Sequence, residues 1–133
     1  MSEDLLISIV DDEELVREAL RALVQSLGYK AVTFSSAELF LQSESIAETT
    51  CLITDLQMPG LNGIDLQEAL KLQGNQIPVI LVTAYPNDKQ RTRALNNGAV
   101  GFLSKPFDDR SLMECLTNAS KLHHKSGSGC PEK

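Results

Sequence analysis

Residues 51–60 read CLITDLQMPG, an apolar, β-branched run that ends in Asp55 and leads into a Pro-Gly turn. Such a run is typical of a buried strand in a parallel sheet, and the turn reverses the chain after it. A helix is predicted next, because Asn62 can cap the free amides of a first turn and Gly74 can stop the last one. This strand–loop–helix unit sets the pattern for the rest of the chain.

The same alternation extends from this unit toward both ends of the sequence. Strands are predicted at residues 5–10, 31–34, 51–54, 77–83 and 100–103. Helices are predicted between them, with apolar residues at each turn from Leu15 to Leu27, a cap at Ser36, and a last helix from about Asp108. Alternating units of this kind build a doubly wound α/β fold, here a five-stranded parallel sheet with five helices on two faces.

One predicted helix, over residues 87–97, has an unusually narrow apolar stripe. It contains only two apolar side chains, Ala94 and Leu95. Because packing supplies most of the stability of a helix, we expect this to be the most mobile helix of the fold.

Composition limits the domain organisation and the kinds of partner. The 133 residues suit one domain, which we expect over 1–124, with 125–133 as a flexible tail or a truncated linker of Gly, Ser and Pro. Eighteen acidic and 12 basic residues give a net charge of −6. We therefore expect no direct contact with nucleic acid, which needs a concentrated positive face.

Two features of the sequence, its cysteines and its amino terminus, predict a cytoplasmic protein. Cys51, Cys115 and Cys130 are odd in number and lack the close spacing of zinc ligands, so we interpret them as free thiols. The amino terminus has no basic flank before its short apolar run. It is therefore interpreted as neither a signal peptide nor a membrane span.

Polar residues end the predicted strands. They are Asp11 and Asp12, then Asp55, then Thr83, then Lys105. Each has an ordinary structural explanation: a helix cap for the first pair, a turn for Asp55, strand propensity for Thr83 and a strand exit for Lys105. Together they are harder to explain, because the carboxyl ends of parallel strands meet at one edge of a sheet, where such folds hold their functional sites.

Three carboxylates at one edge need a cation. Two carboxylates about 4 Å apart repel each other by roughly 4 kcal/mol at an effective dielectric constant of 20. Oxygen ligands without His or Cys favour Mg²⁺, or the similar Mn²⁺ or Ca²⁺. A metal beside Asp55, with the ammonium of Lys105 and the hydroxyl of Thr83 opposite, is an arrangement for phosphoryl transfer in which Asp55 is the nucleophile.

These residues lie in motifs that resemble a known family. The segments IVDDE, TDLQMPGLNGIDL, ILVTAY and FLSKPF occur in the order and spacing of response-regulator receiver domains of two-component signalling. The resemblance covers about residues 5–122. It implies the strand order 2-1-3-4-5 of the chemotaxis receiver.

The resemblance also implies a role for each residue of the site. Asp55 would accept a phosphoryl group from a sensor histidine kinase, and Asp11, Asp12, Asp55 and the backbone carbonyl of Gln57 would hold Mg²⁺. Lys105 would pair with the acceptor and then with the phosphate. Thr83 and Phe102 would form the switch pair, in which Phe102 turns inward when Thr83 moves toward the phosphate.

Other residues would tune the site. By this resemblance, Gln57 and Tyr85 would occupy positions that in the family set how quickly water removes the phosphate, and a bulky Tyr85 is expected to lengthen its lifetime. The bond between Lys105 and Pro106 is expected to be cis. The segments SAELFL and AVGFLSKPF look most like receivers of nitrogen-fixation-type transcriptional regulators, which implies a homodimer formed on phosphorylation through the fourth helix and fifth strand.

Three alternatives stay open at this point. A flavin- or nucleotide-binding α/β protein would need glycines and hydroxyls where this chain has Asp11 and Asp12. A Mg²⁺-dependent phosphohydrolase with an aspartate nucleophile would usually carry an acid where this chain has Gln57. A degenerate receiver that only binds partners would be expected to lack Asp12, Asp55 or Lys105. The receiver is expected to be no enzyme beyond its own phosphorylation and dephosphorylation.

Overall fold

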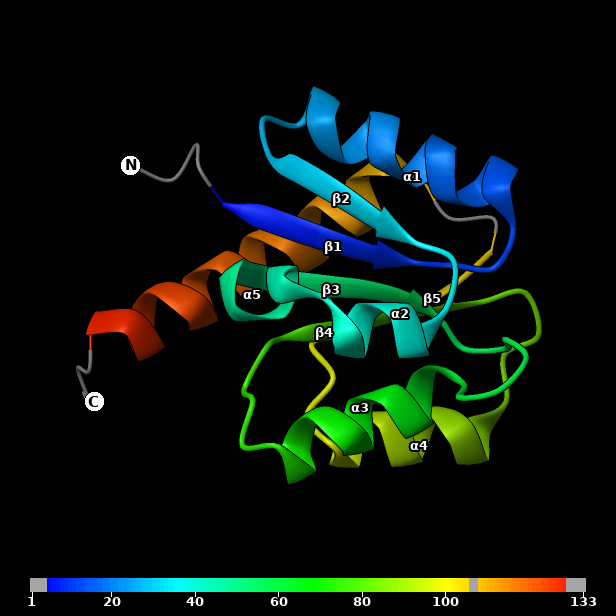
Figure 1. Ribbon diagram of the computed structural model, residues 1–133. Coiled ribbons are helices and arrows are strands. Elements are labelled where there is room, and N and C mark those ends of the chain that lie inside the picture. Colours follow the sequence, from blue (N-terminus) through cyan, green and yellow to red (C-terminus); the bar gives the residue numbers. More distant parts are fainter. Residues whose placement is uncertain (1–4, 106–107, 129–133) are drawn as a thin grey trace.

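The computed structural model describes residues 5–105 and 108–128. It contains one parallel sheet of five strands in the order β2-β1-β3-β4-β5, as the sequence predicts. In Figure 1 the strands lie side by side, with helices on both faces of the sheet. The strands are β1 (Leu6–Val10), β2 (Lys30–Phe34), β3 (Thr49–Asp55), β4 (Val79–Thr83) and β5 (Gly101–Ser104).

Among the described residues, four α-helices and one 3₁₀-helix connect the strands, and a fifth α-helix follows β5. They are α1 (Glu14–Ser26), α2 (Ala37–Gln42), η2 (Glu44–Glu48), α3 (Gly63–Leu72), α4 (Asp88–Asn96) and α5 (Asp109–Ser128). Two predicted caps are confirmed, since Ser36 accepts a hydrogen bond from the amide of Leu39 and Asn62 accepts one from that of Asp65. The predicted stop at Gly74 also holds, because its φ angle of 76° favours glycine, and Gly28 after α1 has a similar φ of 98°.

Side chains that alternate along the strands build a separate hydrophobic core on each face of the sheet. One core packs α1 and α5 against the sheet through side chains that include Ile9, Ile53, Val82, Val24 and Leu116. The other packs α2, α3 and α4 against the opposite face through side chains that include Val10, Leu52, Leu81, Phe40 and Leu70. A sheet covered on both faces is rigid, which fixes the positions of the loops at its edges.

Strand register determines where the polar residues lie. Val10 pairs with Phe34 and Thr54, and Thr83 pairs with Ser104, so the strands end nearly level with one another. The residues that follow or end β1, β3, β4 and β5 therefore lie at one edge of the sheet.

Details of the helices differ from the sequence prediction. The inward face of α1 carries Leu20 and Val24, whereas Leu15 is 87% exposed and Ala19 is also exposed. Both positions had been expected in the apolar stripe, which is in fact rotated by about one residue. In α4 only Ala94 is buried, because Leu95 is 44% exposed. The apolar stripe of α4 is thus narrower than the sequence alone indicates.

Three findings concern the end of helix α5, the cysteines and the length of the helices. Helix α5 extends to Ser128, beyond residue 124, so the division of the chain into 1–124 and 125–133 stays a prediction. Cys51 is buried and Cys115 is half-buried, and both are free thiols, whereas Cys130 lies outside the described residues. No helix in the described part of the chain is long and apolar enough to cross a membrane.

Candidate functional site

Three carboxylates come together at the carboxyl edge of the sheet. Asp11 and Asp12 follow β1, and Asp55 is the last residue of β3. One carboxylate oxygen from each lies within 4.8 Å of the other two. Asp11 and Asp55 are buried, with 0% and 6% of their surfaces exposed, whereas Asp12 is open to solvent. The cluster predicted from the strand ends is therefore present.

Lys105 reaches both buried carboxylates. Its Nζ lies 3.3 Å from Asp11 Oδ2 and 3.4 Å from Asp55 Oδ1. The backbone helps to place the side chain, since the amide of Lys105 donates to the carbonyl of Thr83 at 2.7 Å. One ammonium thus contacts two of the three clustered carboxylates, so the four groups together carry a charge of −2 when all are ionised.

Burial shapes the protonation of the site. Desolvation and the nearby Asp11 carboxylate raise the pKa of Asp55 to about 6, and Lys105 opposes this rise. Burial of the Lys105 ammonium lowers its pKa, but the charges of Asp11 and Asp55 outweigh this effect, so that the pKa is raised. Lys105 therefore stays charged at neutral pH, while at Asp55 the effects of burial and of the Asp11 carboxylate outweigh that of the single Lys105 ammonium.

The cluster fits a divalent cation. Two oxygens bound to one Mg²⁺ at about 2.1 Å lie roughly 3–4 Å apart, close to the spacing of these carboxylates. All three donors are hard oxygens, and their net charge with Lys105 equals that of one divalent ion with opposite sign. Asp11, Asp12 and Asp55 are thus the described residues that could hold a metal.

Thr83, at the end of β4, is engaged by its neighbours. Its buried hydroxyl donates to Gln57 Oε1 at 2.7 Å and accepts from the amide of Tyr85 at 3.0 Å. The side chain of Tyr85 itself is 75% exposed. The structure therefore joins Gln57 and Thr83 directly, although the sequence had assigned them separate roles.

The loop after Asp55 is anchored at three points. The carboxylate of Glu38 in α2 accepts from the amide of Leu61 at 3.2 Å, and Asn62 and Asp65 form a capping box at the start of α3. Gly63 packs so closely that a Cβ there would lie 2.6 Å from the carbonyl oxygen of Asp55. These contacts hold the backbone on both sides of Gln57.

Two predicted residues remain, Phe102 and Pro106. Phe102, in β5, is half-buried and packs against the core beneath α2, α3 and α4. Pro106, and with it the predicted cis bond, lies outside the described residues.

The structure also identifies supporting residues that sequence reasoning missed. Arg17 Nη1 donates to the backbone carbonyl of Asp11 at 2.7 Å, which fixes the loop that carries the acidic pair. Glu38 and Gly63 support the loop after Asp55. Gly63 could have been noticed as a glycine directly after a helix cap, but Arg17 and Glu38 carry no local signal because their role depends on tertiary contacts.

Comparison with known proteins places this site in a family context. The sequence matches the family model described as the response regulator receiver domain over residues 7–117. It is 38% identical over 126 residues to the response regulator protein TodT of Pseudomonas putida, covering 95% of the chain and 56% of TodT. It is 34% identical over 116 residues to the transcriptional regulatory protein FixJ of Azorhizobium caulinodans, covering 87% of the chain and 55% of FixJ. The chain spans about half the length of these curated relatives.

Solved structures agree with this match. The fold superposes on the crystal structure of FixJ-N with a TM-score of 0.80 and 34% identity, covering 89% of this chain and 94% of that one. The predicted strand order, the resemblance of the motifs and the match of the family model are thus consistent with one another. The chain belongs to the response regulator receiver domain family.

Proposed function

We propose that the chain accepts a phosphoryl group on Asp55 from a sensor histidine kinase, in a reaction that requires Mg²⁺. The observation that carries this proposal is the meeting of Asp11, Asp12 and Asp55 within 4.8 Å, with Lys105 on the two buried carboxylates. A nucleophilic carboxylate flanked by hard oxygen ligands and one ammonium suits the transfer of a dianionic phosphoryl group.

Each residue has a part in the transfer. An oxygen of the Asp55 carboxylate forms the new bond to phosphorus while the bond from phosphorus to the histidine nitrogen breaks, and the leaving imidazole takes up a proton. Asp11, Asp12, Asp55 and the carbonyl of Gln57 would hold Mg²⁺, which supplies positive charge to the transferring oxygens. Lys105, already 3.4 Å from Asp55 Oδ1, neutralises another of these oxygens.

The signal would then pass to the face formed by α4, β5 and α5. The Thr83 hydroxyl is expected to leave Gln57 and donate to a phosphoryl oxygen, and Phe102 is expected to turn inward. Support comes from the position of Thr83 at the end of β4 and of Phe102 on the neighbouring strand. The switched face would promote homodimer formation.

The role of the longer protein is proposed by comparison with its relatives. FixJ is named a transcriptional regulatory protein, and the chain matches about half of its length. We therefore propose that this receiver works in the cytoplasm as part of a longer transcriptional regulator, and does not itself contact nucleic acid. Its 18 acidic and 12 basic residues support the absence of contact with nucleic acid.

The test is intact mass after incubation with Mg²⁺ and acetyl phosphate. We expect a gain of one phosphoryl group, lost in Asp55→Asn and suppressed by a chelator. A second measurement addresses the alternative, a Mg²⁺-dependent phosphohydrolase: such an enzyme would turn over a phosphate monoester many times, whereas the receiver should release no more than about one phosphate per chain, and slowly. An unchanged mass in the wild-type chain, with Mg²⁺ present, would refute the proposal.

A further inference from the structure

The side chain of Arg17 closes the loop between β1 and α1. Arg17 is half-buried, and its Nη1 donates to the backbone carbonyl of Asp11 at 2.7 Å. The amide of Arg17 donates to the carbonyl of Glu13 at 2.9 Å, so Arg17 lies in the first turn of α1 and its side chain reaches back beyond the start of the helix. A charged donor at such a distance makes one of the stronger hydrogen bonds found in proteins.

The carbonyl that Arg17 contacts needs such a donor. Asp11 has 0% of its surface exposed, so its carbonyl oxygen is shielded from water in the folded chain. A buried carbonyl without a partner is unfavourable, and nearly all buried carbonyls in proteins are therefore paired. Loss of the Arg17 side chain would leave the carbonyl of Asp11 unpaired unless the loop moved or admitted water.

The same bond fixes the peptide group that joins the two acidic residues of the loop. The carbonyl of Asp11 and the amide of Asp12 belong to one planar unit, which can turn only as a whole. Such a turn would move the two carboxylates relative to each other. The carboxylate of Asp11 has further anchors, because the amide of Glu13 donates to its Oδ1 at 2.9 Å and Lys105 Nζ lies 3.3 Å from its Oδ2. Asp12 is exposed, so the position of its carboxylate follows that of the backbone.

We propose that Arg17 is a positioning residue of the Mg²⁺ site. Its bond to the carbonyl of Asp11 would hold the carboxylates of Asp11 and Asp12 where, together with that of Asp55, their oxygens lie within 4.8 Å of one another. Ligands that are already in place bind a cation more tightly, because less order has to be imposed when the ion binds. This inference rests on the proposed requirement for Mg²⁺ and adds a residue from outside the acidic cluster that sets the affinity for the ion.

The charge of Arg17 and its positioning role have opposite effects on cation binding. The guanidinium lies beside Asp11, and a positive charge there repels a cation. If Arg17 acted through its charge alone, its removal would tighten Mg²⁺ binding. If Arg17 acts by positioning, its removal weakens Mg²⁺ binding. The direction of the change therefore separates the two effects.

The test is a titration of the 133-residue chain with MgCl₂ at constant ionic strength, followed by the amide chemical shifts of residues 11–13 and 56–57. We expect Arg17→Met to bind Mg²⁺ about three- to tenfold more weakly than wild type. This loss is smaller than the roughly 10–100-fold typical of residues that support metal ligands, because the lost charge acts in the opposite direction. Arg17→Gln also ends short of the carbonyl and should show the same weakening.

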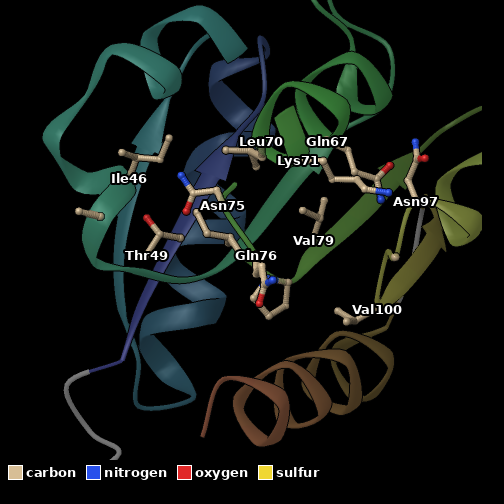
Figure 2. Close-up of a pocket in the computed structure, with 14 residues that line it drawn as sticks. Ile46, Thr49, Gln67, Leu70, Lys71, Asn75, Gln76, Val79, Asn97 and Val100 are labelled. Carbon is tan, nitrogen blue, oxygen red and sulfur yellow. The ribbon is translucent and has the colours of Figure 1, made fainter. Parts of the chain in front are cut away.

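Arg21→Met is the matched control. Arg21 is exposed, lies one turn further along α1 and pairs with Glu18, so its loss removes the same charge without a change in the loop. Its affinity for Mg²⁺ should stay within about twofold of wild type, because solvent and salt screen an exposed charge. The hollow at the opposite edge of the sheet, shown in Figure 2, provides an internal reference. The amides of Val79 and Val100, which line it, should not shift with Mg²⁺ in any of these chains.

A second measurement needs no metal. With chelator present, the amide of Glu13, which donates to Asp11 Oδ1, should exchange its hydrogen several-fold faster in Arg17→Met than in wild type, because the loop opens more easily. Equal or tighter Mg²⁺ binding by the Arg17 variants, a weakening that Arg21→Met shares, or unchanged exchange at Glu13 would overturn the role of Arg17 alone. Failure of the wild-type chain to bind Mg²⁺ would remove the proposed function as well.

Discussion

The hydroxyl of Thr83 donates a hydrogen bond of 2.7 Å to the side-chain oxygen of Gln57. Because a hydroxyl has a single proton, Thr83 has no other to donate while this bond exists. The proposed switch requires that proton for a phosphoryl oxygen on Asp55. The side chain of Gln57 therefore opposes the proposed movement of the Thr83 hydroxyl to a phosphoryl oxygen. This effect is separate from the proposed binding of Mg²⁺ by the backbone carbonyl of Gln57.

Removing this bond should ease phosphorylation. We expect Gln57→Leu to raise the rate of phosphorylation by acetyl phosphate about two- to fivefold, since the lost hydrogen bond is worth about 0.5–1 kcal/mol. The rate is measured from the time course of intact mass. In a Thr83→Val background the same substitution should have no effect, because the hydroxyl is gone. An equal acceleration in both backgrounds would show that Gln57 acts without Thr83.

The raised pKa of Asp55 predicts a pH-dependent effect on stability. Since this pKa is about 6 when folded and 3.8 ordinarily, the folded chain keeps a proton that the unfolded chain releases between these values. The resulting stabilisation is complete below about pH 4 and is lost as the pH rises through 6. Ionised Asp55 should therefore destabilise the metal-free protein at pH 8.

Asp55→Asn tests this prediction. With chelator present, we expect the variant to have a free energy of unfolding about 1–2 kcal/mol higher than wild type at pH 8, and nearly the same at pH 4. Urea unfolding at both values provides the measurement. Asp109→Asn, at an exposed position, is the control and should show no such dependence. A difference between Asp55→Asn and wild type that is equal at both pH values would contradict the assignment.

Much of the site could be predicted because it depends on local sequence. Asp11, Asp55, Thr83 and Lys105 each end or follow a strand, and parallel register brings such residues to one edge. Contacts between distant segments could not be predicted in this way. The bond from Gln57 to Thr83 spans 26 residues, and its existence depends on how two loops pack.

The dependence on tertiary packing also explains why the buried face of helix α1 was predicted wrongly. In α1, apolar residues occur on more than one face, so periodicity alone could not show that Leu20 rather than Leu15 faces the sheet. The fold was still predicted correctly, because strand order and layer structure depend on the alternation of elements. The exact rotation of one helix changes neither.

Gly63 is predicted to be intolerant of any side chain. A Cβ there would lie 2.6 Å from both the carbonyl oxygen of Asp55 and Leu81 Cδ2. We expect Gly63→Ala to lower the free energy of unfolding by about 1–3 kcal/mol, as overpacking does, even though alanine favours a helix. Gly74→Ala is the control, because its Cβ would meet nothing within 4 Å and only its φ of 76° is strained. Urea unfolding of a Gly63→Ala as stable as wild type would refute the close packing.

Tyr85 offers a test of how the phosphate is shielded from water. The backbone amide of Tyr85 bonds Thr83, so Tyr85→Ala should keep this contact and remove only the exposed ring. We expect dephosphorylation of the isolated phosphorylated chain to become several-fold faster, because the acyl phosphate would be more open to attack. Tyr85→Phe keeps the bulk of the ring and should dephosphorylate at the wild-type rate. An unchanged rate in Tyr85→Ala would end the shielding hypothesis.

Helix α4 is predicted to open more readily than α1. It buries only Ala94, and its other ties to α3 include the hydrogen bond from Gln67 and the contacts of Arg93 and Asn97 with Glu68. Amide hydrogen exchange should therefore be faster in α4 than in α1, since local opening there breaks few buried contacts.

Glu68→Gln isolates one of these ties. It removes the charge that pairs with Arg93, whose Nη2 lies 2.9 Å from Glu68 Oε2, at a surface position. We expect exchange in α4 to rise about two- to fivefold, in keeping with an exposed ion pair, and exchange in α1 to stay the same. Glu18→Gln, which breaks the pair with Arg21 inside α1, is the matched control and should leave α4 unchanged. If α4 were as protected as α1 in the wild-type chain, it could not be the most mobile helix that its narrow apolar stripe predicts.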